Sequence, residues 1–226
     1  MSSSTKIIAI DGPAGSGKST TARKVADKLG FIFLDTGAMY RAVTFLALEK
    51  KIPLSDSEAL QNLAASMQIE FSDDSEGQRV SVNSRDITSQ IRTTEVTAAV
   101  SEVSAHAGVR RHMVAKQMEM GEKYDIVAEG RDTTSVVFPD ATLKVYLVAS
   151  IEERAKRRVI DFQRMGKITT VQEQIKAIQE RDDYDSGREH SPLKMTDDSI
   201  QVDTTKLTIE GQVNKIIELF KEKIGE

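Results

Sequence analysis

Residues 12–19 read Gly-Pro-Ala-Gly-Ser-Gly-Lys-Ser and match the pattern G-x-x-x-x-G-K-[ST]. The apolar run at residues 6–10 indicates a buried β-strand, and residues 20–29 carry apolar side chains at helical spacing. A glycine-rich turn between a strand and a helix is the context in which this pattern binds phosphate groups. We therefore predict a phosphate-binding loop, the P-loop, rather than a glycine-rich turn without a ligand.

The residue types of this loop suit the chemistry of phosphate binding. Glycines let the backbone curl so that successive N–H groups face phosphate oxygens, and the following helix adds the partial positive charge of its N-terminus. Lys18 is expected to reach the β- and γ-phosphates, and the Ser19 hydroxyl is expected to bind Mg²⁺ together with phosphate oxygens and water.

The bulk composition narrows the class of protein. The 226 residues suit one large domain or a core domain with insertions, and 39% hydrophobic with 29% charged residues is typical of a globular chain. A net charge of -4 argues against a broad nucleic-acid surface, and the absence of cysteine excludes disulfides and thiolate metal sites. No apolar run reaches membrane-spanning length, and the N-terminus lacks an apolar signal core. We expect a cytoplasmic protein without membrane or nucleic-acid partners, and a monomer by default.

Further apolar runs alternate with helical patterns along the chain. They cover residues 31–35, 124–129, 143–149 and 199–203. With residues 6–10 they predict an α/β fold with a doubly wound, five-stranded parallel sheet and helices on both faces. Residues 68–88 alternate apolar and polar side chains around a polar turn at 73–77, which predicts a β-hairpin inserted into this fold.

Polar side chains follow two of the predicted strands. Asp35, Thr36 and Arg41 come after one strand, and Arg131 with Asp132 comes after another. Carboxyl ends of parallel strands are where α/β folds bind ligands, so these residues are candidates for holding a second substrate. A helix cap with a surface arginine, and a plain ion pair, remain the structural alternatives.

Two later segments are rich in charge. Residues 154–168 are basic and predict a lid over phosphates, with a solvated charged helix face as the alternative. Arg181, Asp185 and Arg188 are spaced four and then three residues apart, so they share one face if the helix persists that far. They can clamp a phosphate or form a salt-bridge ladder. Capping boxes at residues 55–58 and 170–173 predict helix starts.

The chain resembles the bacterial cytidylate kinases over essentially its full length. The matching stretches are IDGPAGSGKST (10–20), LDTGAMYRA (34–42), the spaced residues of 86–110, EGRD and VVFPDA (129–141), LVAS with ERA.RR (147–158), and ERDDYDSGRE with PLK (180–194). The resemblance implies a P-loop kinase fold, with a small monophosphate-binding insertion at about 36–105 (its family-specific part at about 68–92) and a short lid at about 154–168. It implies transfer of the γ-phosphate of ATP to CMP or dCMP, with Mg²⁺.

The resemblance also implies roles for individual residues. Asp132 would bear on the sugar, and Ser101, Arg110 and Asp185 would read the cytosine edge. The implied ATP-binding residues are Gly12, Pro13, Ala14, Gly15, Ser16, Gly17, Lys18, Ser19, Thr20, Arg154 and Arg158. The implied CMP-binding residues are Thr36, Arg41, Ser101, Arg110, Arg131, Asp132, Arg181, Asp185 and Arg188. The implied catalytic residues are Lys18, Arg131, Asp132, Arg158 and Arg188.

The chain departs from the family pattern at one place. Thr134 stands where the pattern GRDxG[ST] has a glycine. If that position requires positive φ, a β-branched residue there is strained, which puts the backbone around Asp132 in doubt.

Two other functions compete with this interpretation. One is a kinase for a different monophosphate, UMP or AMP. The other is a nucleotide-dependent switch or scaffold, which is disfavoured as a GTPase because the chain lacks an N-K-x-D motif.

Overall fold

The computed structural model describes residues 5–74, 77–164 and 166–226. The chain divides into two compact units, one made of Met1–Asp35 with Met118–Glu226 and the other of Thr36–Gln117. We describe the two units separately. Within the described residues, no helix combines the length and apolar character needed to cross a membrane.

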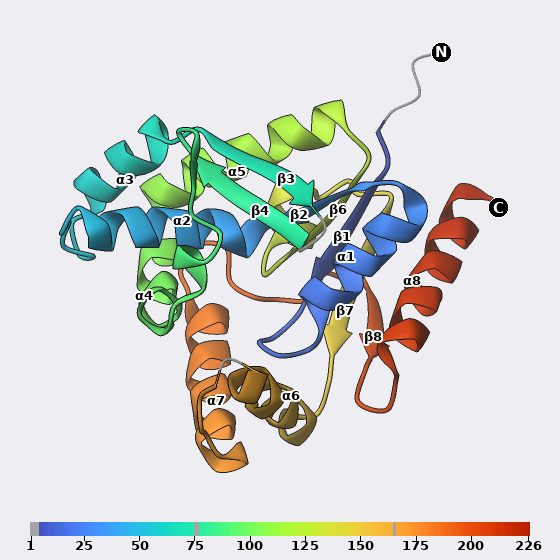
Figure 1. The fold of residues 1–226 in the computed structure, drawn as a ribbon. Helices are drawn as coiled ribbons and strands as arrows, with labels where there is room; N and C mark the ends of the chain where they lie inside the picture. Colours follow the sequence, from blue (N-terminus) through green and yellow to red (C-terminus); the bar gives the residue numbers. More distant parts are fainter. Residues whose placement is uncertain (1–4, 75–76, 165) are drawn as a thin grey trace. The chain divides into compact units, whose positions relative to one another are not determined.

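The larger unit is built on a five-stranded sheet whose strands are all parallel, as predicted (Figure 1). The strand order is β2-β6-β1-β7-β8. The bounds are β1 (Ile7–Asp11), β2 (Ile32–Asp35), β6 (Ile126–Gly130), β7 (Leu143–Val148) and β8 (Ile200–Asp203). The apolar runs of the sequence therefore form the strands, because a parallel sheet buries both of its faces and needs near-continuous apolar side chains.

The same unit contains the helices α1 (Lys18–Leu29), α6 (Ile151–Arg164), α7 (Val171–Gly187) and α8 (Ile209–Ile224). Of these, α1 and α8 pack on the sheet, whereas α6 and α7 pack on each other. Val25 of α1 and Ile216 of α8 join Ile8 and Ile10 of β1 in one buried apolar cluster. Phe31 and Phe220 add an edge-to-face ring contact with centroids 5.6 Å apart. This packing fixes α1, and with it the end of the P-loop, against the centre of the sheet.

The sheet topology brings polar strand ends together. β1 lies between β6 and β7, so the chain leaves β1 for the outermost β2 and then returns to β6. Asp11 is paired with Gly130, and Asp35 with Glu129, at the carboxyl ends of these strands. Loops that follow adjacent parallel strands share one edge, which is where open α/β sheets bind ligands.

The smaller unit combines helices with the predicted hairpin. Its elements are α2 (Thr36–Glu49), α3 (Ser57–Ser66), β3 (Ile69–Asp74), β4 (Gly77–Val82), β5 (Arg85–Asp86), η1 (Gln90–Arg92), α4 (Thr94–Ala105) and the first part of α5 (Ala107–Lys123). β3 and β4 pair antiparallel, which confirms the hairpin, and β5 adds a short third strand. Residues 75–76 of the predicted turn lie outside the described residues.

The capping predictions had different outcomes. Thr170 and Glu173 form the complete capping box at the start of α7. The box predicted at Ser55 is wrong by one residue: Asp56 is the cap, and its carboxylate accepts the N–H of Ala59 at 3.0 Å. Aspartate and serine are comparable N-caps, so the sequence alone does not choose between neighbouring candidates.

Candidate active site

The P-loop, residues 12–19, takes a backbone path that its glycines permit. Gly12 has φ 151°, and a Cβ there would lie 2.1 Å from the carbonyl oxygen of Leu147. Gly15 has φ 76°, a left-handed conformation that residues with a side chain rarely adopt. These two positions therefore require glycine, one for close approach to β7 and the other for the turn.

Cationic side chains hold the carbonyl groups of this loop. Lys18 Nζ donates to Pro13 O at 2.7 Å, Arg154 Nη1 donates to Ala14 O at 3.1 Å, and Arg157 Nη1 donates to Ser16 O at 3.3 Å. Thr204 Oγ1 also donates to Ser16 O, at 3.0 Å. The loop is thus shaped by the protein itself before any ligand binds.

The helix that follows the loop begins without a side-chain cap. Gly17 is the N-cap of α1 and has no side chain to bond the first-turn N–H groups. Those N–H groups have no intrahelical acceptor, and the helix dipole favours negative charge beside them. The end of the loop is therefore suited to bind an anion such as a phosphate.

Burial, and after it the positive charge of Arg131, lower the pKa of the Lys18 ammonium to about 7. The carboxyl groups of Glu129 and Asp11 act in the opposite direction. Lys18 therefore titrates near neutral pH, and a polyphosphate placed beside it favours its charged form.

Two carboxyl groups lie near the predicted metal ligand. Ser19 Oγ donates to Glu129 Oε1 at 2.7 Å, and the Asp35 charge acts on Glu129 from the neighbouring strand. Burial raises the pKa of Glu129, and Asp35 raises it further. No group of three or more candidate metal-ligating side chains occurs within the described residues. A hydroxyl and carboxylates fit Mg²⁺, which takes one or two protein oxygens and completes its shell with phosphate oxygens and water.

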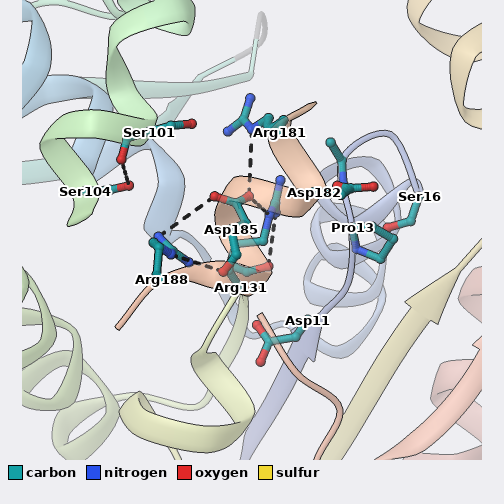
Figure 2. A network of polar contacts seen from close by, with 12 residues as sticks. Asp11, Pro13, Ser16, Ser101, Ser104, Arg131, Arg181, Asp182, Asp185 and Arg188 are labelled. Carbon is teal, nitrogen blue, oxygen red and sulfur yellow. Dashed lines mark hydrogen bonds and ion pairs between the residues drawn. The ribbon is translucent and has the colours of Figure 1, made fainter. Parts of the chain in front are cut away.

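Three arginines converge on one buried carboxylate (Figure 2). Arg131 Nε donates to Asp185 Oδ2 at 2.9 Å, and Arg181 and Arg188 each place a nitrogen 3.9 Å from an Asp185 oxygen. The Asp185 side chain is only 4% exposed. Within these four residues the positive charges outnumber the negative, and planar guanidinium groups match phosphate oxygens in geometry. The structure thus brings Arg131 together with Arg181, Asp185 and Arg188, the three residues predicted to form a phosphate clamp or a salt-bridge ladder.

Arg181, Asp185 and Arg188 were expected to share one helical face if the helix persisted that far, and it does not reach Arg188. The helix ends at Gly187, and Arg188 is its C-cap with extended φ and ψ. Its Nε instead donates to the carbonyl oxygen of Asp185 at 3.3 Å. The Arg188 side chain still lies beside the same carboxylate, with Nη1 3.9 Å from Asp185 Oδ1.

The expected strain at Thr134 is absent. Among the described residues, the non-glycine positions with positive φ are Lys51, Asn83, Ser84 and Ser191. The π-helical turn η2 (Thr133–Val137) instead places Thr133 and Thr134 against Asp11. Each threonine donates both its backbone N–H and its hydroxyl to the Asp11 carboxylate, over 2.7–3.0 Å.

This clamp ties the end of β1 to the chain that follows Arg131. Asp11 directly precedes the P-loop, and Asp132 directly precedes the two threonines. Asp132 is buried at 4% exposure. Burial raises the pKa of Asp11, and the four hydrogen bonds oppose that rise. The hydroxyl of Thr134 is therefore a structural donor to the Asp11 carboxylate.

Three arginines of the basic segment predicted to form a lid make hydrogen bonds within the protein. Arg154 and Arg157 bond the P-loop, and Arg158 Nε donates to Gln174 Oε1 of α7 at 2.9 Å. Met165 lies outside the described residues. ATP contacts by Arg154 and Arg158, and the lid itself, stay predictions.

The predicted residues of the smaller unit form their own arrangement. Arg110 is 4% exposed, lies over the Tyr40 ring at 5.2 Å, and donates to Ser104 O at 3.1 Å. Ser104 Oγ donates in turn to Ser101 O at 3.0 Å. Thr36 is buried at the start of α2 and Arg41 follows on the same helix. Contacts of Thr36, Arg41, Ser101 and Arg110 with CMP stay predictions.

Four residues at this site were not predicted from the sequence: Asp11, Glu129, Arg157 and Asp182. Glu129 had a usable signal, because it ends a buried strand next to Gly130-Arg131-Asp132. Asp182 follows Arg181 directly, and the spacing of Arg181, Asp185 and Arg188 gave no reason to select it. Asp11 and Arg157 act through partners more than 100 residues away, which no local pattern reveals.

Comparison with known proteins places these observations in a family. The family model described as cytidylate kinase matches residues 8–222. A cytidylate kinase of Geobacillus sp. (strain WCH70) is 46% identical over 218 residues, covering 96% of this chain and 97% of the relative. The cytidylate kinase of Bacillus subtilis (strain 168) is 44% identical over 216 residues, covering 96% of each chain.

Solved structures show the fold only. A gluconokinase from Sinorhizobium meliloti 1021 has a TM-score of 0.51 at 13% identity and covers 97% of this chain and 93% of its own. An uncharacterised protein from Eubacterium ventriosum has a TM-score of 0.53, also at 13% identity, covering 96% of this chain and 99% of its own.

Replacing Thr134 tests whether its hydroxyl stabilises the Asp11 clamp. Thr134→Val should lower the free energy of unfolding by about 1–3 kcal/mol, because a buried carboxylate oxygen loses a donor. Thr134→Gly should also be destabilising, and Thr134→Ser should retain most of the stability. Denaturant unfolding measures all three. A glycine variant more stable than the parent would show that Thr134 is strained after all.

The lowered pKa of Lys18 predicts proton uptake when ATP binds. Above about pH 7 the free protein carries neutral Lys18, whereas the bound phosphates stabilise the ammonium. Calorimetry in buffers of different ionisation enthalpy should give uptake of about one proton at pH 8 and about 0.1 at pH 6. Affinity should fall as the pH rises above 7. The exposed Lys28, on the same helix, supplies the control Lys28→Ala, which should keep the uptake. Equal binding enthalpies in all buffers at pH 8 would contradict the titration of Lys18.

Proposed function

Because the chain belongs to the cytidylate kinase family, we propose that it transfers the γ-phosphoryl group of ATP to CMP or dCMP. The products are ADP and CDP or dCDP. The observation that carries the proposal is that the larger unit holds both a preformed P-loop and three arginines converging on Asp185.

A transfer between two phosphates needs more positive charge than hydrolysis does. At ~4 Å two like unit charges repel by about 4 kcal/mol at an effective dielectric constant near 20. Arg131, Arg181 and Arg188 offset this repulsion on the acceptor side, and Lys18 offsets it on the donor side. Guanidinium groups also stabilise the charge spread over the transferred group in the transition state.

The donor side uses the loop and the helix N-terminus. N–H groups at the end of residues 12–20 bind the β- and γ-phosphates, with Lys18 beside them. Ser19 would hold Mg²⁺, and the carboxyl groups of Glu129 and Asp35 would add negative charge beside it. When bound, Mg²⁺ supplies charge neutralisation and a fixed geometry for the triphosphate.

The acceptor needs no dedicated general base. A phosphate monoester has a second pKa of about 6, so it is already a nucleophile near neutral pH. Arg131 and Arg188 orient it in line with the leaving ADP, and Arg181 assists. Arg158 adds charge to the transferred group, and Asp132 orients the sugar.

Recognition of cytosine is assigned to Ser101, Arg110 and Asp185. The exocyclic amine of cytosine donates a hydrogen bond that a serine or aspartate oxygen accepts. Uracil presents a carbonyl oxygen there, which cannot donate to a serine or aspartate oxygen, so CMP should be preferred to UMP. The proposal further includes a monomer that acts on small molecules in the cytoplasm.

A panel of monophosphate acceptors tests this function. With ATP and Mg²⁺, CMP and dCMP should be phosphorylated with kcat/KM above that for UMP or AMP. Lys18→Ala should lower kcat by roughly 10²–10³-fold, because the developing phosphate charge loses its ammonium. Lys28→Ala should stay within about twofold of the parent, since Lys28 is exposed and far along the helix.

The same panel identifies the competing functions. A higher kcat/KM for AMP or UMP than for CMP would show that the proposed acceptor is wrong and identify the correct one. ATP hydrolysis that no monophosphate alters would favour a nucleotide-dependent switch. Near-normal turnover by Lys18→Ala would contradict the role of the P-loop.

A further inference from the structure

We propose that Asp182 is a positioning residue that fixes the position of the P-loop relative to the arginine cluster around Asp185. This inference rests on the proposed function, because it assigns how the donor and acceptor sites keep their relative placement. Asp182 itself contacts neither substrate in this account.

The peptide groups on either side of Ala14 are held together by two side chains. Ala14 N–H donates to Asp182 Oδ1 at 2.9 Å, and Ala14 O accepts from Arg154 Nη1 at 3.1 Å. Arg154 and Asp182 also form an ion pair with each other. Their side chains are 10% and 18% exposed, so water competes little for these contacts.

The bonds from Asp182 and Arg154 hold a residue that lies between Pro13 and a glycine of the loop. Gly12 and Gly15, on either side of Pro13 and Ala14, both have φ values open mainly to glycine. The side chains of these residues supply no packing, and Ala14 supplies one methyl group. Arg154 Cβ also lies 3.2 Å from the position that a Cβ of Gly15 would occupy, so α6 packs closely on the loop. The clamp therefore removes backbone freedom that the glycines would otherwise leave.

The same turn of α7 carries the acceptor cluster. Asp182 stands between Arg181 and Asp185, and Asp185 is bonded to Arg131 at the end of β6. Figure 2 shows Asp182 beside the loop at Pro13 and Asp185 among the arginines, both on α7. A helix turn is rigid compared with a glycine-rich loop, so bonding both groups to one turn fixes the distance between them. In-line transfer depends on such placement, and a misplacement of about 1 Å can cost 10²-fold in rate.

A matched set of variants tests the assignment. Asp182→Ala removes the acceptor for Ala14 N–H and the partner of Arg154. Asp182→Asn keeps an oxygen for Ala14 N–H and loses the charge. The exposed neighbour Asp183 gives the control Asp183→Asn on the same helix.

The kinetic signature should separate positioning from simple destabilisation. We expect Asp182→Ala to lower kcat by roughly 10- to 100-fold while the KM values for ATP and CMP change by about threefold or less. Asp182→Asn should fall between this variant and the parent, and Asp183→Asn should match the parent. Thermal unfolding, measured in parallel, shows that each variant is folded at the assay temperature.

A second measurement does not depend on turnover. Amide hydrogen exchange at Ala14 should be faster in Asp182→Ala by tenfold or more, and unchanged in Asp183→Asn. Parent-like exchange, or parent-like kcat in a folded Asp182→Ala protein, would overturn the inference. If the parent fails to phosphorylate CMP while exchange at Ala14 is still faster in Asp182→Ala, the proposed function is wrong. The role of Asp182 in holding the P-loop is then still supported.

Discussion

The structure depends on the capture of carbonyl oxygens in the P-loop by cationic side chains. A tight loop that turns N–H groups toward a ligand must turn other carbonyl groups into the protein, where each needs a donor. Lys18, Arg154 and Arg157 supply those donors from α1 and α6. Because the donors come from two helices of the larger unit, the fold determines the shape of the anion site. The loop is therefore already ordered, and triphosphate binding pays little conformational entropy for it.

Buried charge is the second constraint. Lys18, Glu129, Asp11 and Asp185 are all nearly removed from water, and each has an oppositely charged or hydrogen-bonded partner. These partners reduce the cost of burial. Burial also lowers the pKa of the Lys18 ammonium toward neutral pH. A site that holds several cations before its substrates arrive is well matched to two phosphate-bearing substrates.

The fold was largely readable from local sequence, whereas the contacts that shape the site were not. The five strands follow from apolar runs, and α7 starts at the capping box at Thr170–Glu173, because both signals are local. The bonds from Asp182 to Ala14 and from Asp11 to Thr133 and Thr134 join residues 122 to 168 positions apart. Such pairs appear only when the sheet order is known. Thr134 also could not be interpreted from local sequence. Its position in the motif suggested backbone strain, whereas in the structure its hydroxyl donates to the Asp11 carboxylate.

The most direct test is a crystal structure of the protein with a non-hydrolysable ATP analogue and CMP. The account predicts the β- and γ-phosphates against the N–H groups of residues 15–19, with the Lys18, Arg154 and Arg157 contacts to the loop carbonyls retained. It also predicts the CMP phosphate against Arg131 and Arg188. A triphosphate bound away from the loop, or a loop that rebuilds its backbone and releases those carbonyls, would contradict it.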